Sequence, residues 1–371
     1  MEAVYDRRIN ELPKIDNHEA LSQLLRDPTI ASKNWVYRQY DHTVRTGTVV
    51  KPGSDAAVFF VRYANKILAA TTDCNSLYCR LDPREGGKIA VAEAARNLTC
   101  SGAKPLAITD NLNFGNPYKP ENFWQLREAV EGIAEACRTF GTPVTGGNVS
   151  LYNESPAGVV DPTPTVAMVG LIDKEEHITT QWFKDEGDAI VLLGDIADAK
   201  DPLLGLGGSA YLQVIRGRKT GTPPPCDLET AKTLHTTLLG LIQSGLVKSA
   251  HDCSEGGLAV CLAESCMSQL VGRETPRLIG AEIDLSGLKQ DPALRLDGLL
   301  FGETQSRVVV TCAPLDAVKV VERAKLFGVP AAQIGRVGGD KLIVKTASGE
   351  FSASVSELHN AWWNAIARAM A

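Results

Sequence analysis

The sequence has 371 residues, of which 44% are hydrophobic and 22% are charged, and its formal net charge is −6 at pH 7. This length allows two domains with separate cores, and the negative charge argues against broad nucleic-acid binding, which needs a cationic surface. No run approaches the roughly 18 apolar residues that span a bilayer, and the N-terminus lacks an apolar signal segment. We therefore expect a cytoplasmic protein that binds neither nucleic acid nor a membrane.

The first predicted unit follows a polar arm. Residues 1–34 show no sustained hydrophobic period, so we interpret them as a linker with one short helix near 19–25. Residues 35–180 combine strands with two helices whose apolar residues recur at helical spacing. The expected strands are 49–50, 57–61, 67–72, 105–109, 143–145 and 165–172, and the expected helices are 88–100 and 121–139. Gly102, just past the first helix, is typical of a helix C-terminus.

The second predicted unit spans residues 181–371 and begins with the buried strand AIVLLG. Strands and helices alternate along it, which indicates an α/β class for the chain. The expected elements are a helix at 228–244, a strand at 247–250, a helix after HDCSEGG, a strand at 307–312, a helix at 315–327 and a hairpin around Gly338-Gly339.

Nine cysteines raise the question of disulfides or a metal. Their number is odd, no CxxC pair occurs, and several stand among apolar neighbours. We therefore expect reduced, mostly buried thiols in a reducing compartment.

The segment TGGNVS (145–150) follows a predicted strand. Its glycines would let a ligand approach the main chain, and exposed N–H groups of such a loop attract phosphate. Asn148 and Ser150 add neutral oxygens of the type that hold Mg²⁺ or phosphate. A Gly-Gly pair after a strand is also an ordinary turn, so the pattern alone leaves both interpretations open.

The segment ITDNLNFGNP (108–117) places Asp110 where a strand is expected to become a loop. Ligand groups in open α/β sheets usually occupy such positions. Asp and Asn also form Asx-turns by bonding their own backbone, which is the alternative.

The segment AHDCSEGG (250–257) precedes a predicted helix. Ser254 could cap this helix, whose N-terminus is an anion site, and Asp252 could hold a metal. Capping alone would also explain the pattern.

The segment LLFGETQSR (299–307) precedes a predicted strand. Glu303, Thr304 and Gln305 could point donors and acceptors into a cleft. They could equally form an edge loop beside a solvated Arg307.

The order of these motifs resembles one family, the formylglycinamide ribonucleotide amidotransferases (phosphoribosylformylglycinamidine synthases) of the small, separately encoded type. The likeness is to their C-terminal half and covers residues 35–340. It is carried by YDHTVRTGTVVKPGSDAAV, TTDCNSLYCRLDPREGGKIAVAEAARNLTCSGAKPLAITDNLNFGNP, TGGNVSLYNE, HDCSEGGLA and LFGETQSR. The wider superfamily includes aminoimidazole ribonucleotide synthetase and selenophosphate synthetase.

The resemblance implies a barrel-forming N-terminal domain followed by an α/β C-terminal domain. The family's reaction joins ammonia, taken from glutamine, to formylglycinamide ribonucleotide and converts ATP to ADP and phosphate, in purine biosynthesis. It implies ATP and Mg²⁺, and as partners an N-terminal half, a glutaminase subunit and a small accessory subunit.

Four site residues carry over by position. The family's ATP-contacting aspartate and glycine fall on Asp110 and Gly147, its metal-binding asparagine falls on Asn148, and its substrate-contacting serine falls on Ser150. By the internal pseudo-symmetry of the family, a further set would line an auxiliary site. That set is Asp252, Glu303, Thr304 and Gln305.

The resemblance also implies that catalytic groups are missing. The family's catalytic histidine, most metal-binding acids and proton acceptor lie in the first half. His42 takes the place of that histidine but has no assigned role in this half, so we expect no catalytic residue here. We predict one half of an ATP-dependent C–N ligase that self-associates through its barrel domain. The alternatives are a non-catalytic nucleotide-binding half and another ATP-dependent synthetase of the superfamily.

Overall fold

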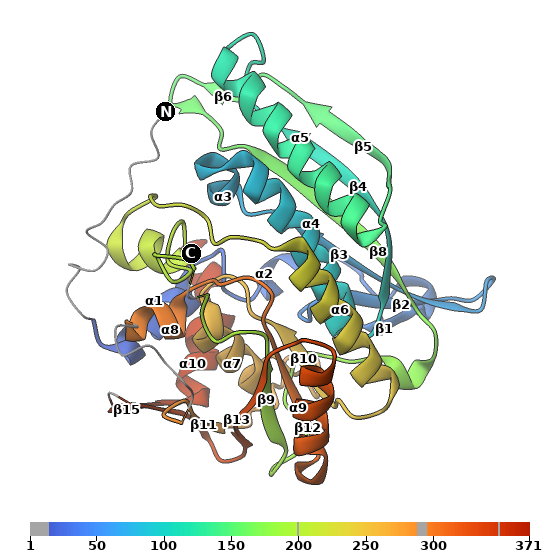
Figure 1. Ribbon diagram of the computed structural model, residues 1–371, viewed down its shortest axis with the longest axis vertical. Coiled ribbons are helices and arrows are strands. Elements are labelled where there is room, and N and C mark those ends of the chain that lie inside the picture. The colour runs from blue at the N-terminus through green and yellow to red at the C-terminus, as the bar shows by residue number, and fades with distance from the viewer. Residues whose placement is uncertain (1–14, 199, 288–294, 348) are drawn as a thin grey trace.

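The computed structural model describes residues 15–198, 200–287, 295–347 and 349–371. Two sheets organise these residues, one in each half of the chain (Figure 1). Helices pack on both sheets, so the α/β class is confirmed. None of the described helices combines the length and apolar character needed to cross a membrane.

The first sheet has six strands. In spatial order they are β1 (Thr48–Val50), β2 (Ala57–Val61), β3 (Lys66–Asp73), β8 (Thr163–Ile172), β4 (Lys104–Asn113) and β5 (Val144–Ser150). Only the pair β4–β5 is parallel. The sheet is open, with β1 and β5 at its ends, and no closed barrel occurs within the described residues.

Three helices follow the strands of this unit. They are α3 (Ser76–Leu81), α4 (Pro83–Cys100) and α5 (Pro120–Phe140). α4 begins earlier than the sequence period suggests, because Asp82 accepts a hydrogen bond from Glu85 N at 3.0 Å and Pro83 takes the first helical position. Gly102 follows α4 with a φ of 85°, as predicted. A two-stranded ribbon completes the unit with β6 (Glu154–Ser155) and β7 (Gly158–Val159).

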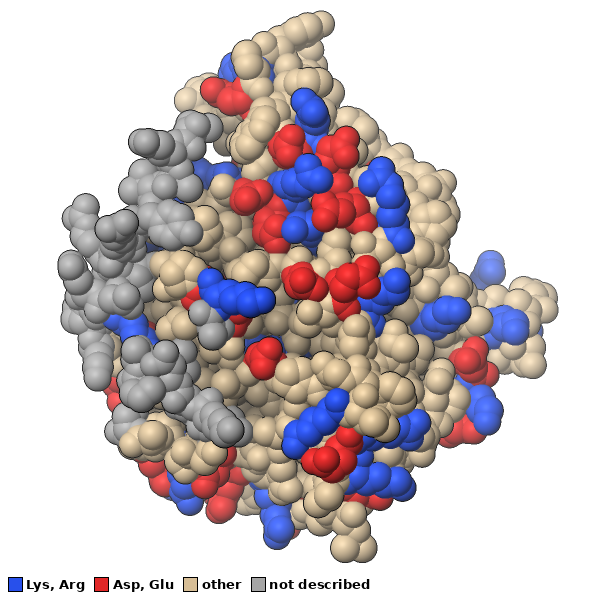
Figure 2. Space-filling model, in the orientation of Figure 1, with Lys and Arg blue, Asp and Glu red and all other residues tan. Residues whose placement is uncertain are grey.

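Helices α4 and α5 approach each other closely on one face of the sheet (Figure 1). A β-carbon on Gly87 would stand 2.4 Å from Ala129 O, and one on Gly132 would stand 2.1 Å from Arg84 O. The two glycines therefore let the backbones of α4 and α5 touch. Side chains of both signs are interspersed over the outer side of these helices (Figure 2).

The second sheet has seven strands. In spatial order they are β10 (Ser249–Asp252), β12 (Val308–Cys312), β9 (Ala189–Leu193), β13 (Ala331–Val337), β11 (Ala281–Asp284), β14 (Lys341–Thr346) and β15 (Gly349–Ser354). All five residues of β9 are buried because helices cover both faces. An apolar cluster lies on each face of this sheet. Ile190 and Leu192 belong to one cluster, and Val191 and Leu193 belong to the other.

The helices of this unit divide between the two faces. They are α6 (Leu228–Gln243), α7 (Gly257–Met267), α8 (Leu296–Phe301), α9 (Ala317–Leu326), α10 (Val355–Trp363) and α11 (Ala365–Ala369), with a π-helical turn at Tyr211–Ile215. α6 and α9 cover one face, whereas α7, α8 and α10 cover the other.

The predicted hairpin around Gly338-Gly339 was wrong. β13 and β14 flank these glycines, but β11 lies between the two strands and pairs with both. A turn signal fixes a change of direction, whereas pairing depends on which strand has the matching apolar face.

The predicted short helix in the N-terminal arm is confirmed as α1 (Asn17–Arg26). It does not belong to a free arm, because Leu21, Leu24 and Leu25 are fully buried in the core of the second unit. Its apolar side chains pack near α7 and α10. All nine cysteines are free and eight are buried, as expected, whereas Cys74 is half-buried.

Candidate functional site

The first candidate site lies on β4 and β5. Asp110 pairs directly with Gly147, and Asn111 pairs with Asn148. β4 extends to Asn113, and β5 contains the whole of VTGGNVS. The predictions of a loop at Asp110 and of a loop at TGGNVS were therefore wrong. Pairing between the two strands overrides the turn preference of Gly and Asn, and the β5 N–H groups that face β4 join the ladder instead of forming an open phosphate nest.

Asp110 and Gly147 are in very close contact. A β-carbon on Gly147 would stand 1.8 Å from Asp110 Oδ1 and 2.7 Å from Asp110 O. Burial raises the pKa of the half-buried Asp110 carboxyl. The arrangement holds a partly exposed carboxylate against the main chain of Gly147, where it can accept hydrogen bonds from hydroxyl or amino groups of a ligand.

Asn148 and Ser150 are held by neighbouring amides. Asn148 Nδ2 donates to Asn111 Oδ1 at 3.2 Å. This bond engages the amide nitrogen and leaves the side-chain oxygen of Asn148 as the acceptor for a ligand. Ser150 Oγ donates to Asn153 Oδ1 at 3.2 Å, and Asn153 Nδ2 donates to Phe114 O at 3.0 Å. Both side chains are therefore oriented by hydrogen bonds before a ligand arrives.

The four predicted residues divide between the two faces of the sheet. Successive strand residues point to opposite faces, so Asp110 and Gly147 lie on the face of the buried Leu112, which the helices cover. Asn148 and Ser150 lie on the open face. Because β5 is the end strand of the described sheet, a ligand that contacts all four residues must cross its edge.

The fit of this edge to a metal is partial. In the described ranges, no three His, Cys, Asp or Glu side chains come together as metal ligands. Asn148 offers one neutral oxygen, which suits Mg²⁺, and Mg²⁺ commonly takes its other ligands from phosphates and water. Among the described residues, this edge therefore offers one protein ligand, Asn148, to an ion whose other ligands would come from elsewhere.

The second candidate site is buried between the two units. Asp252 of β10 forms an ion pair with Arg96 of α4, and both side chains are buried. Arg96 Nη1 also donates to Gln305 Oε1 at 3.5 Å. Burial raises the pKa of Asp252, and Arg96 opposes this shift. The pair ties a helix of the first unit to the sheet of the second.

Glu303 is surrounded by protein donors. Its Oε1 accepts from Gly256 N at 2.8 Å and from Ala210 N at 2.9 Å, and the Tyr78 hydroxyl donates to the other oxygen. Burial and the nearby Glu255 raise the pKa of Glu303 to about 8. Glu303 therefore links three segments of the chain.

Thr304 and Gln305 are buried beside it, and so is Arg307. Arg307 Nε donates to Thr304 O at 2.9 Å, and Nη1 donates to Ile196 O at 3.0 Å. The interpretation of an edge loop with a solvated Arg307 was wrong, because backbone carbonyls hold the guanidinium inside the fold.

The capping role considered for Ser254 was also wrong. α7 begins at Gly257, and its N-cap is Gly256, which has a φ of 79° and provides no side chain. Ser254 stands too early in the turn to cap the helix, and the N–H of Gly256 bonds to Glu303.

The sequence interpretation missed further buried carboxylates around Asp252. Burial raises the pKa of Asp73 and of Glu93, and the neighbouring acids raise both further. Glu93 Oε2 lies 3.8 Å from Arg96 Nη2 on the same helix. The sequence carried a signal for one pair of this cluster, since Glu93 and Arg96 are three residues apart in an alanine-rich segment.

His42 belongs to neither candidate site. It precedes β1, at the end of the first sheet opposite β5, and its ring meets Tyr37 edge-on with centroids 6.1 Å apart.

These two sites lie in a two-unit α/β protein with an open mixed sheet followed by a sheet covered on both faces. Residues 53–172 match the N-terminal domain of AIR synthase related proteins, and residues 185–346 match their C-terminal domain. The chain therefore belongs to the AIR synthase related proteins and carries both of their domains.

Individual relatives agree with this family. The chain is 48% identical over 352 residues to the phosphoribosylformylglycinamidine synthase subunit PurL of Alkaliphilus metalliredigens. The aligned region covers 95% of this chain and 45% of that protein. The chain spans about half the length of the curated relatives it matches.

Two solved structures share the fold. Thermotoga maritima PurL complexed with FGAR has a TM-score of 0.70 at 19% identity, over 95% of this chain and 55% of that one. A chain of a HypE–HypF complex has a TM-score of 0.59 at 19% identity, over 86% of this chain and 96% of that one.

Proposed function

We propose that the chain is the second half of an ATP-dependent phosphoribosylformylglycinamidine synthase. The observation that carries this proposal is the edge formed by Asp110, Gly147 and Asn148 in an AIR synthase related chain. The curated relatives are PurL subunits of about twice its length. Structures of Thermotoga maritima PurL are described with FGAR and with ATP, which supports the same substrates for this chain.

The missing half would cover the open face of the first sheet. Ala167, Val169 and Leu171 alternate with buried residues of β8 and so point to this face. A shallow hollow of about 490 Å³ lies there and is lined mainly by small apolar side chains and threonines. This face is the proposed barrel-forming surface, and either a first half or a second copy of the chain would bury it.

The proposed reaction transfers the γ-phosphoryl group of ATP to the amide oxygen of formylglycinamide ribonucleotide. Ammonia then attacks the amide carbon and displaces phosphate, leaving the amidine and ADP. Asp110 would accept hydrogen bonds from the nucleotide, Gly147 would leave the space that this carboxylate occupies, and Ser150 would orient the second substrate. None of these residues is a nucleophile or a proton acceptor in the proposal, which leaves that chemistry to the first half.

Mg²⁺ would be held in part by Asn148. When bound, the ion neutralises charge that develops on the transferred phosphoryl group. The oriented carbonyl oxygen of Asn148 can ligate it from the open face.

The proposed partners are the first half, a glutaminase subunit that supplies ammonia and a small accessory subunit. A solved structure of PurLQS from Thermotoga maritima, which shares this fold with a TM-score of 0.69, supports the proposal of partner subunits.

A second candidate function has one observation in its favour. The chain matches a HypE–HypF complex chain over 96% of that chain, so it has the size of a complete one-unit member of the superfamily. On this alternative it would turn over ATP alone or as a dimer of identical chains.

The test is calorimetric titration with a non-hydrolysable ATP analogue, after the chain is mixed with a first half of the same family. Asn148→Ala is expected to weaken binding of the Mg²⁺ complex by about 5- to 150-fold, the range for a lost polar contact that the bound ligand would bury, and to affect the metal-free nucleotide less. Gly147→Val should weaken both forms alike. Undiminished binding of the Mg²⁺ complex by Asn148→Ala would refute the metal role of Asn148.

Activity separates the two candidate functions. We expect the chain alone to form no amidine from ATP, Mg²⁺, ammonia and formylglycinamide ribonucleotide. Turnover should appear after the first half is added. Full activity of the chain alone would favour the one-unit alternative.

A further inference from the structure

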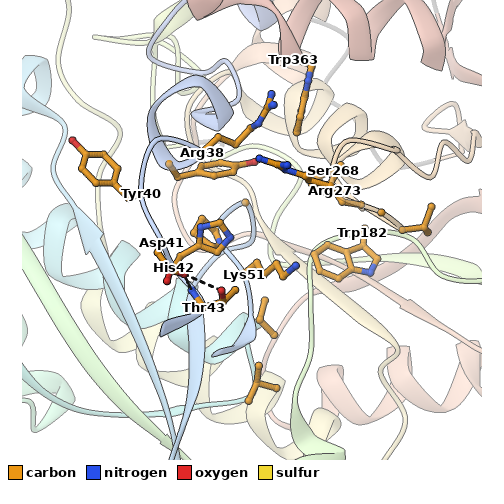
Figure 3. Close-up of a pocket in the computed structure, with 18 of the residues that line it drawn as sticks. Arg38, Tyr40, Asp41, His42, Thr43, Lys51, Trp182, Ser268, Arg273 and Trp363 are labelled. Atoms are coloured by element: carbon orange, nitrogen blue, oxygen red, sulfur yellow. Dashed lines mark hydrogen bonds between the residues drawn. The ribbon is translucent and has the colours of Figure 1, made fainter. Parts of the chain in front are cut away.

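A pocket of about 660 Å³ opens at the β1 end of the first sheet, far along the strand order from β5. Such a volume is typical of small-molecule sites. The segment before and after β1 forms one side, and the loop after α7 and the end of α10 form the other (Figure 3). Its walls are built from residues 37–38, 40–43, 49–53, 268 and 270–273, with Trp182, Trp362 and Trp363.

Cationic groups predominate at the pocket. Arg38, Lys51 and Arg273 all line it (Figure 3). Arg38 forms an ion pair with Glu274, whereas no carboxylate of the described residues lies within ion-pair distance of Lys51 or Arg273. The lining carboxylate, Asp41, already accepts from Thr43 N at 2.8 Å and from Thr43 Oγ1 at 2.9 Å. The pocket therefore has an excess of positive charge, which favours an anionic ligand.

Aromatic rings form much of the remaining wall. Tyr37, Trp182, Trp362 and Trp363 line the same hollow. Trp363 is stacked on His359 with ring centroids 5.5 Å apart, so its plane is fixed. Fixed aromatic faces beside guanidinium groups are suited to a planar ring that carries an anion.

Two polar atoms in this wall lack partners. Ser268 is 7% exposed, and its buried Oγ makes no hydrogen bond within the described residues. The same holds for the buried Nδ1 of His42. Buried polar atoms are normally satisfied, so this wall has hydrogen-bonding capacity that the described residues leave unmet.

We propose that this pocket binds a small ligand in which a sugar joins a phosphate to a planar ring, of the nucleoside monophosphate class. Lys51 and Arg273 bind the phosphate, and the tryptophan walls pack against the ring. The site is separate from the β4–β5 edge, because β1 and β5 are opposite ends of the sheet. It would let a nucleotide be sensed away from the place where ATP is proposed to react.

The experiment is a titration of the 371-residue chain with adenosine monophosphate, followed by tryptophan fluorescence and by calorimetry. Three of the five tryptophans line the pocket, so occupancy should change the emission. We expect saturable binding that is about tenfold tighter than the binding of adenosine or of inorganic phosphate, because each of these lacks one recognised group. Equal affinity for adenosine or for phosphate alone would overturn the proposal, as would no binding at millimolar nucleotide.

Variants locate the site. Lys51→Gln and Arg273→Gln should each lower the affinity for adenosine monophosphate by about tenfold, as expected for the loss of a charge-assisted hydrogen bond. Lys66→Gln, at the exposed first residue of β3, is the matched charge control and should bind like the wild type. Unchanged affinity in both pocket variants, or an equal loss in Lys66→Gln, would contradict the assignment.

Discussion

The carboxylate of Asp110 occupies the space that a side chain at position 147 would need, since Oδ1 lies 1.8 Å from the β-carbon position of Gly147. The neighbouring Gly146 differs, because a β-carbon there would meet no atom within 4 Å. Two adjacent glycines in one strand therefore have different physical reasons to be small. Only Gly147 is required by a close approach, and this contact joins the two strands of the proposed nucleotide edge.

Gly147→Ala is expected to destabilise the fold, because Asp110 must move and its backbone oxygen remains only 2.7 Å away. Forced overpacking of this kind costs about 1–3 kcal/mol. Gly146→Ala is the matched control and should be neutral or slightly stabilising, since glycine weakens a strand. Urea unfolding of both variants measures the difference, and equal stabilities would show that the contact does not constrain the strands.

The limits of sequence inference are clear at this same edge. The apolar period located β4 and β5, and the family motif located Asp110 and Gly147. The division of the four residues between two faces depends on the register Asp110 with Gly147. Local turn preference points to loops there, and only pairing with the neighbouring strand shows that both segments are extended.

The interdomain cluster shows a second kind of limit. Asp73, Glu93 and Asp252 come from three elements that are distant in sequence, so no local spacing predicts that they meet. The hydrophobic pattern predicted most helices and strands near these residues. It could not predict that β11 separates β13 from β14, since pairing across a sheet leaves no periodic trace.

Arg96→Met is expected to cost about 3–5 kcal/mol, because it leaves Asp252 buried without its cation. Arg84→Met is the control, since Arg84 is half exposed and pairs with Glu135 at 3.1 Å, where about 0–1 kcal/mol is expected. The free energies of unfolding in denaturant provide the comparison. A double replacement, Arg96→Met with Asp252→Leu, should recover part of the loss by removing both buried charges.

Glu303→Gln tests the raised pKa of Glu303. Burial and Glu255 raise this pKa to about 8, and a carboxyl raised on folding stabilises the folded state while it is protonated. Its contribution is complete below the pKa of an unfolded glutamate, near 4.3, and is lost as the pH rises through about 8. The stability of the wild type relative to Glu303→Gln should therefore fall with rising pH, by at most about 1.4 kcal/mol per pH unit. A pH-independent difference would show that Glu303 is already ionised in the fold.

Val169→Lys tests the open face of the first sheet. Val169 is 40% exposed, and its neighbours on β3 and β4 are Ala70 and Ala107. We expect the wild-type chain to associate, as a dimer of identical chains or with an added first half, because association removes this apolar face from water. A charge at position 169 would be buried in that interface, so the variant should be monomeric by light scattering at micromolar concentrations while keeping the melting temperature of the unassociated chain.

The control is Val130→Lys on α5, which is equally exposed at 39% but lies on a helix rather than on the open face. Loss of association in both variants, or a monomeric wild type, would show that the open face is not where partners bind.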